Sequence, residues 1–192
     1  MKELIEICLE DAESVIRAEK GGADRVELCG DLFEGGTTPT LGTFLTARRH
    51  TSIKINVMIR PRGGDFAYSD IEFETMLEDV RIFKENGADG IVFGILNGDG
   101  TIDRARSEKI IETARPLPVT FHRAFDMTKD LFSSLETLID MGVDRVLTSG
   151  EEPTVMEGIL NLKALVEKAG DRIIVMPGCG INEKNFSYLK ET

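Results

Sequence analysis

The chain has 192 residues, which is long enough to bury one sizeable core and short for two full domains. Hydrophobic residues make up 41% of the sequence and charged residues 30%, a balance that is typical of ordinary globular proteins. The formal net charge of −11 argues against sequence-independent binding to nucleic acids or to anionic membranes, since both favour clustered lysine and arginine.

The cysteines and the apolar segments indicate in which cellular compartment the protein is expected. Cys8, Cys29 and Cys179 are too few and too scattered for the disulfide framework of a small secreted protein. The first residues lack the long apolar stretch of a signal peptide, and charged residues interrupt every apolar segment before it reaches the length of a membrane span. We therefore expect a cytoplasmic protein with reduced thiols, and neither nucleic acid nor membrane as a partner.

Strands and helices are predicted to alternate along the chain. A glycine followed closely by an apolar run recurs at 22–28, 87–93 and 142–148 and, more loosely, at 170–175. The glycine suits the left-handed position that ends a helix, and the apolar run suits the strand that follows. Strands are predicted at 3–8, 24–29, 53–60, 90–95, 118–122, 144–149 and 172–177. Helices are predicted at 11–20, 41–50, 70–86, 103–114, 130–141 and 153–168, and a last helix near 182.

Seven repeated βα units of this kind indicate an α/β protein with parallel strands. A TIM-type (β/α)₈ barrel needs eight strands to close, and an open doubly wound sheet also accommodates alternating units. The evenness of the repeat favours the barrel. We therefore expect one barrel domain over residues 1–192, incomplete at its C-terminus because the eighth βα unit is absent.

The alternation of side chains along each strand predicts which residues face the barrel interior. Ile5 and Ile7 are expected to pack against helices, as are Val26 and Leu28. The charged side chains that this alternation directs inward are Glu6, Arg25, Glu27, Arg60 and His122. Buried charges at this density are expected to pair with one another, and a closed ion-pair network is one interpretation of Glu6 and Arg25.

Cys8 and Cys29 are the last inward-facing residues of two neighbouring predicted strands. Each follows a glutamate by two residues, in a Glu-x-Cys sequence. Adjacent strands lie about 4.8 Å apart, so two thiols at similar height can share a metal ion. Two thiolates suit Cu(I), whereas tetrahedral Zn²⁺ would take two further ligands. The alternative is that both cysteines are small buried core residues, and Glu6 and Glu27 beside them are expected to raise the thiol pKa.

Polar groups at the predicted strand ends also suit an active site. His122 can act as a general acid or base near neutral pH with Glu27 as partner base, and Arg60 can hold a carboxylate or phosphate. Further candidate ligand-binding residues at these ends are Glu6, Arg62, Asp65, Arg123, Asp126, Thr148 and Ser149. The alternative function is therefore an enzyme that acts on a small anionic substrate, bearing phosphate or carboxylate, by acid/base chemistry.

The glycine-rich segment 177–182 follows the last predicted strand and precedes a helix. Many barrels bind phosphate at this place on backbone N–H groups, which makes Gly178 and Gly180 candidate ligand-binding residues. The glycines of 34–38 and 62–65 would likewise let the backbone approach a ligand closely. The alternative is that these glycines only form turns. Cys179 is not expected to bind metal.

Several motifs together are similar to those of the CutC copper-homeostasis family, and the resemblance extends over nearly the whole chain. They lie at 6–8, 22–29, 34–40, 60–66, 68–70, 119–126, 145–150 and 176–181. The resemblance implies a TIM-type barrel, a cytoplasmic homo-oligomer (a dimer or higher) and a role in copper handling. It also assigns copper ligation to Cys8 and Cys29. The sequence thus predicts a Cu(I)-binding protein whose partner is a copper ion or, in the alternative, a small anionic ligand.

Overall fold

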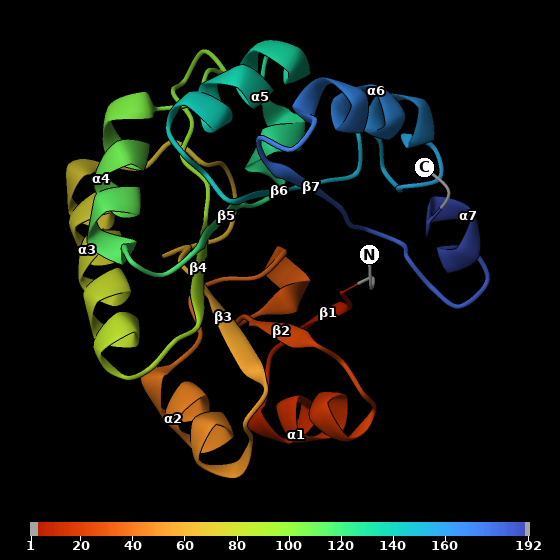
Figure 1. Ribbon diagram of the computed structural model, residues 1–192. Coiled ribbons are helices and arrows are strands. Elements are labelled where there is room, and N and C mark those ends of the chain that lie inside the picture. The colour runs from red at the N-terminus through yellow and green to blue at the C-terminus, as the bar shows by residue number, and fades with distance from the viewer. Residues whose placement is uncertain (1–3, 191–192) are drawn as a thin grey trace. The chain divides into compact units, whose positions relative to one another are not determined.

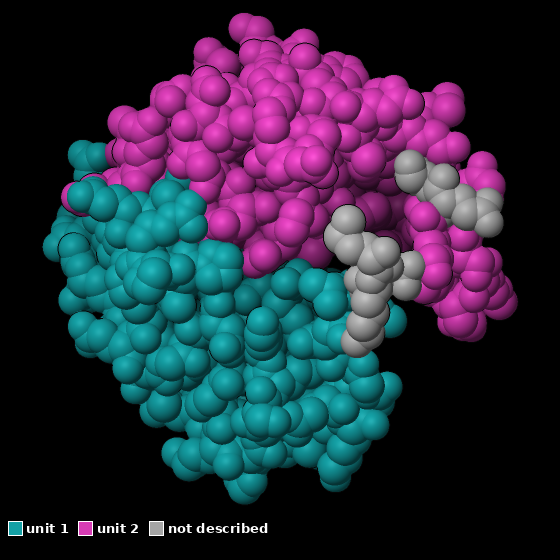
Figure 2. Space-filling view, viewed as in Figure 1, with its two compact units in different colours: residues 1–93, 110–118 teal, residues 94–109, 119–192 magenta. Residues whose placement is uncertain are grey.

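The computed structural model describes residues 4–190, and the chain divides into two compact units, which Figure 2 colours separately. Unit 1 comprises Met1–Phe93 and Ile110–Pro118, and unit 2 comprises Gly94–Lys109 and Val119–Thr192. Figure 1 shows strands and helices alternating along the chain in both units. Within residues 4–190, no helix has the length and apolar character needed to cross a membrane.

The described residues of unit 1 form four strands, and strands that follow one another in the chain pair in parallel. The strands are β1 (Glu6–Leu9), β2 (Arg25–Leu28), β3 (Lys54–Met58) and β4 (Gly90–Phe93). They alternate with α1 (Ala12–Lys20), α2 (Leu41–His50) and α3 (Asp70–Glu85), and a short 3₁₀ helix, η1 (Leu32–Glu34), follows β2. The pairing sets Cys8 beside Glu27 and Asn56 beside Gly90, which fixes the residues of the candidate site.

The described residues of unit 2 form three strands, which also pair in parallel in chain order. The strands are β5 (Val119–Phe121), β6 (Arg145–Thr148) and β7 (Ile174–Pro177). The helices of this unit are α5 (Leu131–Asp140), α6 (Ile159–Ala169) and α7 (Phe186–Lys190), with the 3₁₀ helix η2 (Arg123–Met127) after β5. Helix α4 (Arg104–Ala114) begins in unit 2 and ends in unit 1.

The seven parallel strands, each followed by a helix, have the pattern of a TIM-type (β/α) fold, so the predicted fold class is confirmed. All seven predicted strands are present, although each is shorter than predicted, and residue 3 of the first lies outside the described residues. That residues 1–192 form a single domain stays a prediction.

A repeated aspartate links neighbouring strands. The side chains of Asp24, Asp89 and Asp144 each accept a hydrogen bond from a backbone N–H group within one residue of the start of the preceding strand. In each case the aspartate N–H also donates to the carbonyl of that same residue, which is Ile5, Ile55 or Val119. The glycine two residues before each aspartate has a positive φ of 73–90°. This is the left-handed conformation that the recurring glycine predicts for a helix end. The recurring glycine and aspartate therefore have two roles: the glycine ends a helix, and the aspartate aligns the strand that follows.

Two helices begin several residues later than predicted. Helix α6 begins at Ile159 rather than 153, because the backbone at Gly158 packs so closely on Ser149 that a Cβ there would lie 1.8 Å from the Ser149 carbonyl oxygen. Residues 153–154 form a bend and residues 155–158 form turns before the helix. Helix α7 begins at Phe186, after a turn rather than near 182. The two 3₁₀ helices, η1 and η2, were not predicted, since segments this short have no periodic pattern.

The core follows the predicted alternation in β2 and β3 but not in β1. Val26, Leu28 and Ile55 are fully buried, whereas Ile5 and Ile7 are 43% and 41% exposed. The prediction that these two isoleucines are covered by helices is therefore wrong. Within unit 1, β1 pairs only with β2, which leaves one flank of the strand open.

Gly90 is expected to tolerate no larger residue. A Cβ at Gly90 would lie 2.3 Å from Asn56 Oδ1 and 3.2 Å from the Pro118 carbonyl oxygen. Displacing Asn56 would also break its hydrogen bond to Glu6. We expect Gly90→Ala to lower the free energy of unfolding by about 1–3 kcal/mol, measured by urea denaturation. Gly98→Ala is the control, because no atom lies within 4 Å of a Cβ there, and an equal loss in both variants would contradict the explanation.

Candidate functional site

Cys8, Glu27 and Cys29 form a compact cluster in unit 1. The Sγ atoms of Cys8 and Cys29 lie 3.7 Å apart, and each lies 3.5 Å from Oε1 of Glu27. The strand register explains the arrangement, because Cys8 pairs with Glu27 and Cys29 follows Glu27 by two residues on the same side of the strand. Among residues 4–190, this is the one group of three or more potential metal ligands that lie this close together. The structure thus brings together the two cysteines and the glutamate singled out in the sequence.

Burial dominates the electrostatics of this cluster. Glu27 is 3% exposed, and its burial, together with the charge of Glu6, raises the pKa of its carboxyl group from 4.5 to about 7. Its Oε2 atom has no hydrogen-bond partner among the described residues. The pKa of the Cys29 thiol is raised by its hydrogen bond with Cys8, by burial and by the nearby Glu27 charge, in the direction that the sequence predicts. The free cluster therefore holds the Cys29 thiol in its protonated form at neutral pH.

An ion pair neighbours the cluster on the same strands. Glu6 pairs with Arg25, and the side chains are 8% and 13% exposed. Glu6 Oε2 also accepts a hydrogen bond of 3.0 Å from Nδ2 of Asn56. These contacts match the interpretation of Glu6 and Arg25 as a buried pair. The pair fills the interior without offering Glu6 to a ligand, and a ligand-binding role for Glu6 stays a prediction.

Arg60 holds a loop over Cys29. Its Nη1 donates to the carbonyl oxygens of Glu34 (2.8 Å) and Gly36 (2.9 Å), and its Nη2 donates to that of Gly64 (2.9 Å). Gly36, with φ of 89°, lies directly against the cysteine, since a Cβ there would be 3.1 Å from Cys29 Sγ. The guanidinium is thus engaged by backbone carbonyls rather than by a carboxylate. This contact is invisible in the sequence, because the acceptors are not side chains.

Arg62 is engaged in a similar way. Its Nε donates to Glu72 (2.6 Å) and its Nη2 to Asp65 (3.1 Å), and its guanidinium lies 5.1 Å from the ring centre of Tyr68. These bonds hold the segment that leads into α3. Arg62 and Asp65 therefore bind each other in this structure, and their role in ligand binding stays a prediction.

In unit 2, Asp126 is the centre of a dense hydrogen-bond network. Its carboxylate accepts from the hydroxyl groups of Thr148 and Ser149, from the backbone N–H groups of Ser149 and Glu151, and from Nε of Arg123 (2.8 Å). Both Thr148 and Ser149 thus contact the same carboxylate. Because the carboxylate oxygens are already occupied by these donors, the network is suited to hold η2 against the end of β6.

His122 has a defined hydrogen-bond role at the end of β5. Its Nδ1 accepts from the backbone N–H of Ala124 at 3.0 Å, which places the proton of the neutral ring on Nε2. The ring packs on Gly94, where a Cβ would lie 2.4 Å from Cε1. In this tautomer Nε2 is a donor rather than a base. Gly94 is a residue that the sequence analysis missed, and no pattern in the sequence marks it.

The glycines of the segment 177–182 make backbone contacts within unit 2. The N–H of Gly178 donates to the carbonyl of Thr148 at 2.9 Å and so extends the β6–β7 ladder. Gly180 has φ of 84°, and its carbonyl oxygen accepts from the side chains of Asn182 and Asn185. The glycines therefore serve the turn that leads to α7, and a phosphate-binding role for Gly178 and Gly180 stays a prediction.

The three catalytic candidates do not belong to one unit. Glu27 and Arg60 lie in unit 1, and His122 lies in unit 2. Within unit 1, Glu27 contacts the two thiols and Arg60 contacts the loop that covers Cys29. A joint catalytic role for these three residues stays a prediction.

The raised pKa of Glu27 predicts a specific pH dependence of stability. The folded protein binds the proton more tightly than the unfolded chain, so stability is highest below pH 4.5 and falls as the pH rises to about 7. The full loss amounts to about 3 kcal/mol for a shift of this size. For metal-free protein, we expect Glu27→Gln to be more stable than the wild type at pH 8 and nearly equal at pH 4.5, measured by urea denaturation. Exposed Glu74→Gln is the control, and a difference that does not change with pH would contradict the burial of a titrating Glu27.

The hydrogen bonds from Arg60 to the loop over Cys29 predict that the reactivity of Cys29 depends on this arginine. Lysine keeps the charge but cannot bridge several carbonyl oxygens, so Arg60→Lys should open the loop over Cys29 more often. In a background with Cys8 and Cys179 replaced by serine, we expect alkylation of Cys29 to become about tenfold faster or more. Arg81→Lys, on the surface of α3, should leave the rate unchanged. An unchanged rate in Arg60→Lys would mean that the loop does not control access.

Comparisons with known proteins identify the family of this chain. The model of the CutC family matches residues 3–192. The human copper homeostasis protein cutC homolog is 51% identical over 188 residues, which cover 98% of this chain and 69% of the relative. A CutC family protein of Parabacteroides distasonis is 51% identical over 191 residues, covering 99% and 79%. A crystal structure of CutC from Streptococcus agalactiae is 37% identical, covers 99% of this chain and 94% of that chain, and has a TM-score of 0.93. The chain therefore belongs to the CutC family.

Proposed function

We propose that this protein acts in copper homeostasis by binding Cu(I) through the thiolates of Cys8 and Cys29, with Glu27 as a third donor. The observation that carries the proposal is the distance of 3.7 Å between the two Sγ atoms. Two thiolates bound at about 2.3 Å to one ion lie roughly 3.8–4.0 Å apart when the angle between the two bonds is about 110–120°. The free thiols thus already have the separation that a shared ion requires.

The donor set favours a soft ion. Thiolate ligands select Cu(I), and structural Zn²⁺ sites use four protein ligands, whereas this group contains two sulfurs and one carboxylate. The human relative is named for copper homeostasis, which supports copper as the ion. Oε2 of Glu27, buried and without a partner among the described residues, is a further potential ligand atom.

Glu27 also suits the proton release that ion binding requires. Both thiols must lose their protons to bind the ion, and each lies within hydrogen-bonding distance of Glu27 Oε1. A carboxyl group with a pKa of about 7 can accept a proton from a thiol and pass it to solvent near neutral pH. Affinity for the ion is therefore expected to rise with pH.

Location and assembly follow from the same proposal. Thiolate ligation of Cu(I) requires reduced cysteines, which is the state expected in the cytoplasm. A homo-oligomer, dimer or higher, is part of the proposal by resemblance to the family.

The enzyme alternative has less support. Arg60 and Arg62 donate to protein acceptors, and the Asp126 carboxylate is filled by protein donors. Groups already paired in this way have little capacity left for an anionic substrate.

Anaerobic titration with Cu(I) against a chromophoric chelator tests the copper proposal. We expect about one tightly bound ion per chain, and a loss of affinity of at least about 100-fold in Cys8→Ser and in Cys29→Ser. Glu27→Gln should weaken binding by a smaller factor. Cys179→Ser is the matched control, because this cysteine lies in the 177–182 segment outside the cluster. Full affinity in the double variant of Cys8 and Cys29 would reject these ligands.

A further inference from the structure

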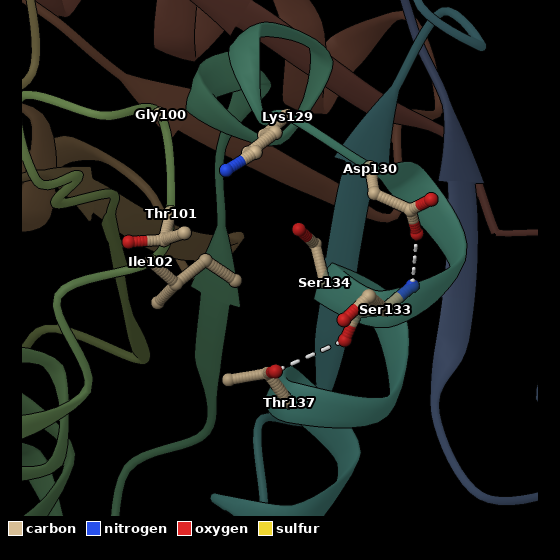
Figure 3. Close-up of a pocket in the computed structure, with 8 residues that line it drawn as sticks. All are labelled: Gly100, Thr101, Ile102, Lys129, Asp130, Ser133, Ser134 and Thr137. Carbon is tan, nitrogen blue, oxygen red and sulfur yellow. Dashed lines mark hydrogen bonds between the residues drawn. The ribbon is translucent and has the colours of Figure 1, made fainter.

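Unit 2 contains a pocket that none of the functions above uses. It has a volume of about 410 Å³, which is within the range of sites for small molecules. One wall is the segment 100–102, and the other is formed by Lys129, Asp130 and one face of α5 (Figure 3). The backbone N–H of Lys129 donates to the Gly100 carbonyl at 3.0 Å and holds the two walls together.

Most polar groups of the pocket are engaged by the protein itself. Asp130 caps α5 by accepting from the Ser133 N–H at 2.6 Å, and Thr137 donates to the Ser133 carbonyl at 2.9 Å. The Thr101 hydroxyl donates to Asp99 and accepts from Asn97. These contacts make the walls rigid and define which groups remain for a ligand.

Ser134 is the exception. The residue is only 7% exposed, and its hydroxyl group has no hydrogen-bond partner among residues 4–190. Figure 3 shows this hydroxyl pointing into the pocket, between the two walls. Because this hydroxyl is not among the side-chain atoms that are fully shielded from solvent, it is open to the pocket and free to bond a ligand there.

Lys129 adds a positive charge at the same pocket. Its ammonium group extends over the cavity in Figure 3. Its charge also acts on the carboxylate of Asp99, whose pKa is lowered mainly by hydrogen bonds with Thr101 and in smaller part by Lys129. The serine hydroxyl can both donate and accept, as the hydroxyl groups of a polyol do, and the ammonium is suited to a phosphate or carboxylate. We propose that this pocket binds a small polyhydroxylated molecule that bears one anionic group, with Lys129 on the anion and Ser134 on a hydroxyl.

This proposal is independent of copper binding. The pocket belongs to unit 2, whereas Cys8, Glu27 and Cys29 belong to unit 1, and the two sets share no residue. Either site can therefore fail its test without affecting the other.

Thermal shift and calorimetry on the full chain test the proposal with glycerol 3-phosphate, ribose 5-phosphate and gluconate as probes. We expect at least one of these anionic polyols to raise the melting temperature in a concentration-dependent way. Glycerol has the hydroxyl groups without the anionic group, and inorganic phosphate has the anionic group without the polyol. Each should bind at least about tenfold more weakly. Equal binding of inorganic phosphate would show that only the charge is recognised and would overturn the proposal.

Two variants assign the contacts. Ser134→Ala should weaken binding of the active probe about tenfold, and Lys129→Met should weaken it about tenfold or more at low salt. Without probe, Ser134→Ala should be at least as stable as the wild type, because the hydroxyl has no partner in the protein. Lys163→Met, an exposed lysine of α6, is the control for the lost charge. Absence of any shift with all three anionic polyols, or a shift that both variants retain in full, would refute the site.

Discussion

Three aspartates, Asp24, Asp89 and Asp144, set the alignment on which the rest of the structure depends. Each carboxylate receives a backbone N–H at the start of the preceding strand, at 2.8–3.0 Å, while the aspartate's own N–H returns a bond to the same residue. The interaction fixes the register of neighbouring strands at the end opposite to the candidate sites. Since a slip of one residue would exchange the two faces of a strand, Cys8 and Glu27 meet only because this register holds.

Much of the fold could be predicted because the same short sequence pattern recurs at several junctions from helix to strand. A glycine at positive φ, an aspartate and an apolar run occur together, and each marks a junction from helix to strand. Prediction failed where tertiary contacts override local pattern. The close approach of Gly158 to Ser149 delays the start of α6, and the open flank of β1 exposes Ile5 and Ile7. The spacing of hydrophobic residues in the sequence indicates neither the close approach of Gly158 nor the open flank of β1.

The candidate sites were predictable to different degrees for the same reason. The cluster of Cys8, Glu27 and Cys29 follows from alternation along two strands, so residue spacing alone indicates it. The partners of Arg60 are backbone carbonyls of loops, and those of Asp126 include backbone N–H groups, which no residue type reveals. Ser134 was not singled out at all, because a serine on a helix has no distinctive pattern until the cavity beside it is known.

The unequal exposure of the two thiols implies an order of events for any ion that reaches them. Gly36 lies against the sulfur of Cys29, which is fully buried, whereas Cys8 is open to solvent. If the protein binds copper as proposed, an incoming ion would meet Cys8 first and reach Cys29 second, so a donor molecule could exchange its ligands one at a time. Release would run in reverse, with Cys8 as the last protein contact. Such stepwise exchange would let the ion pass between molecules without entering water.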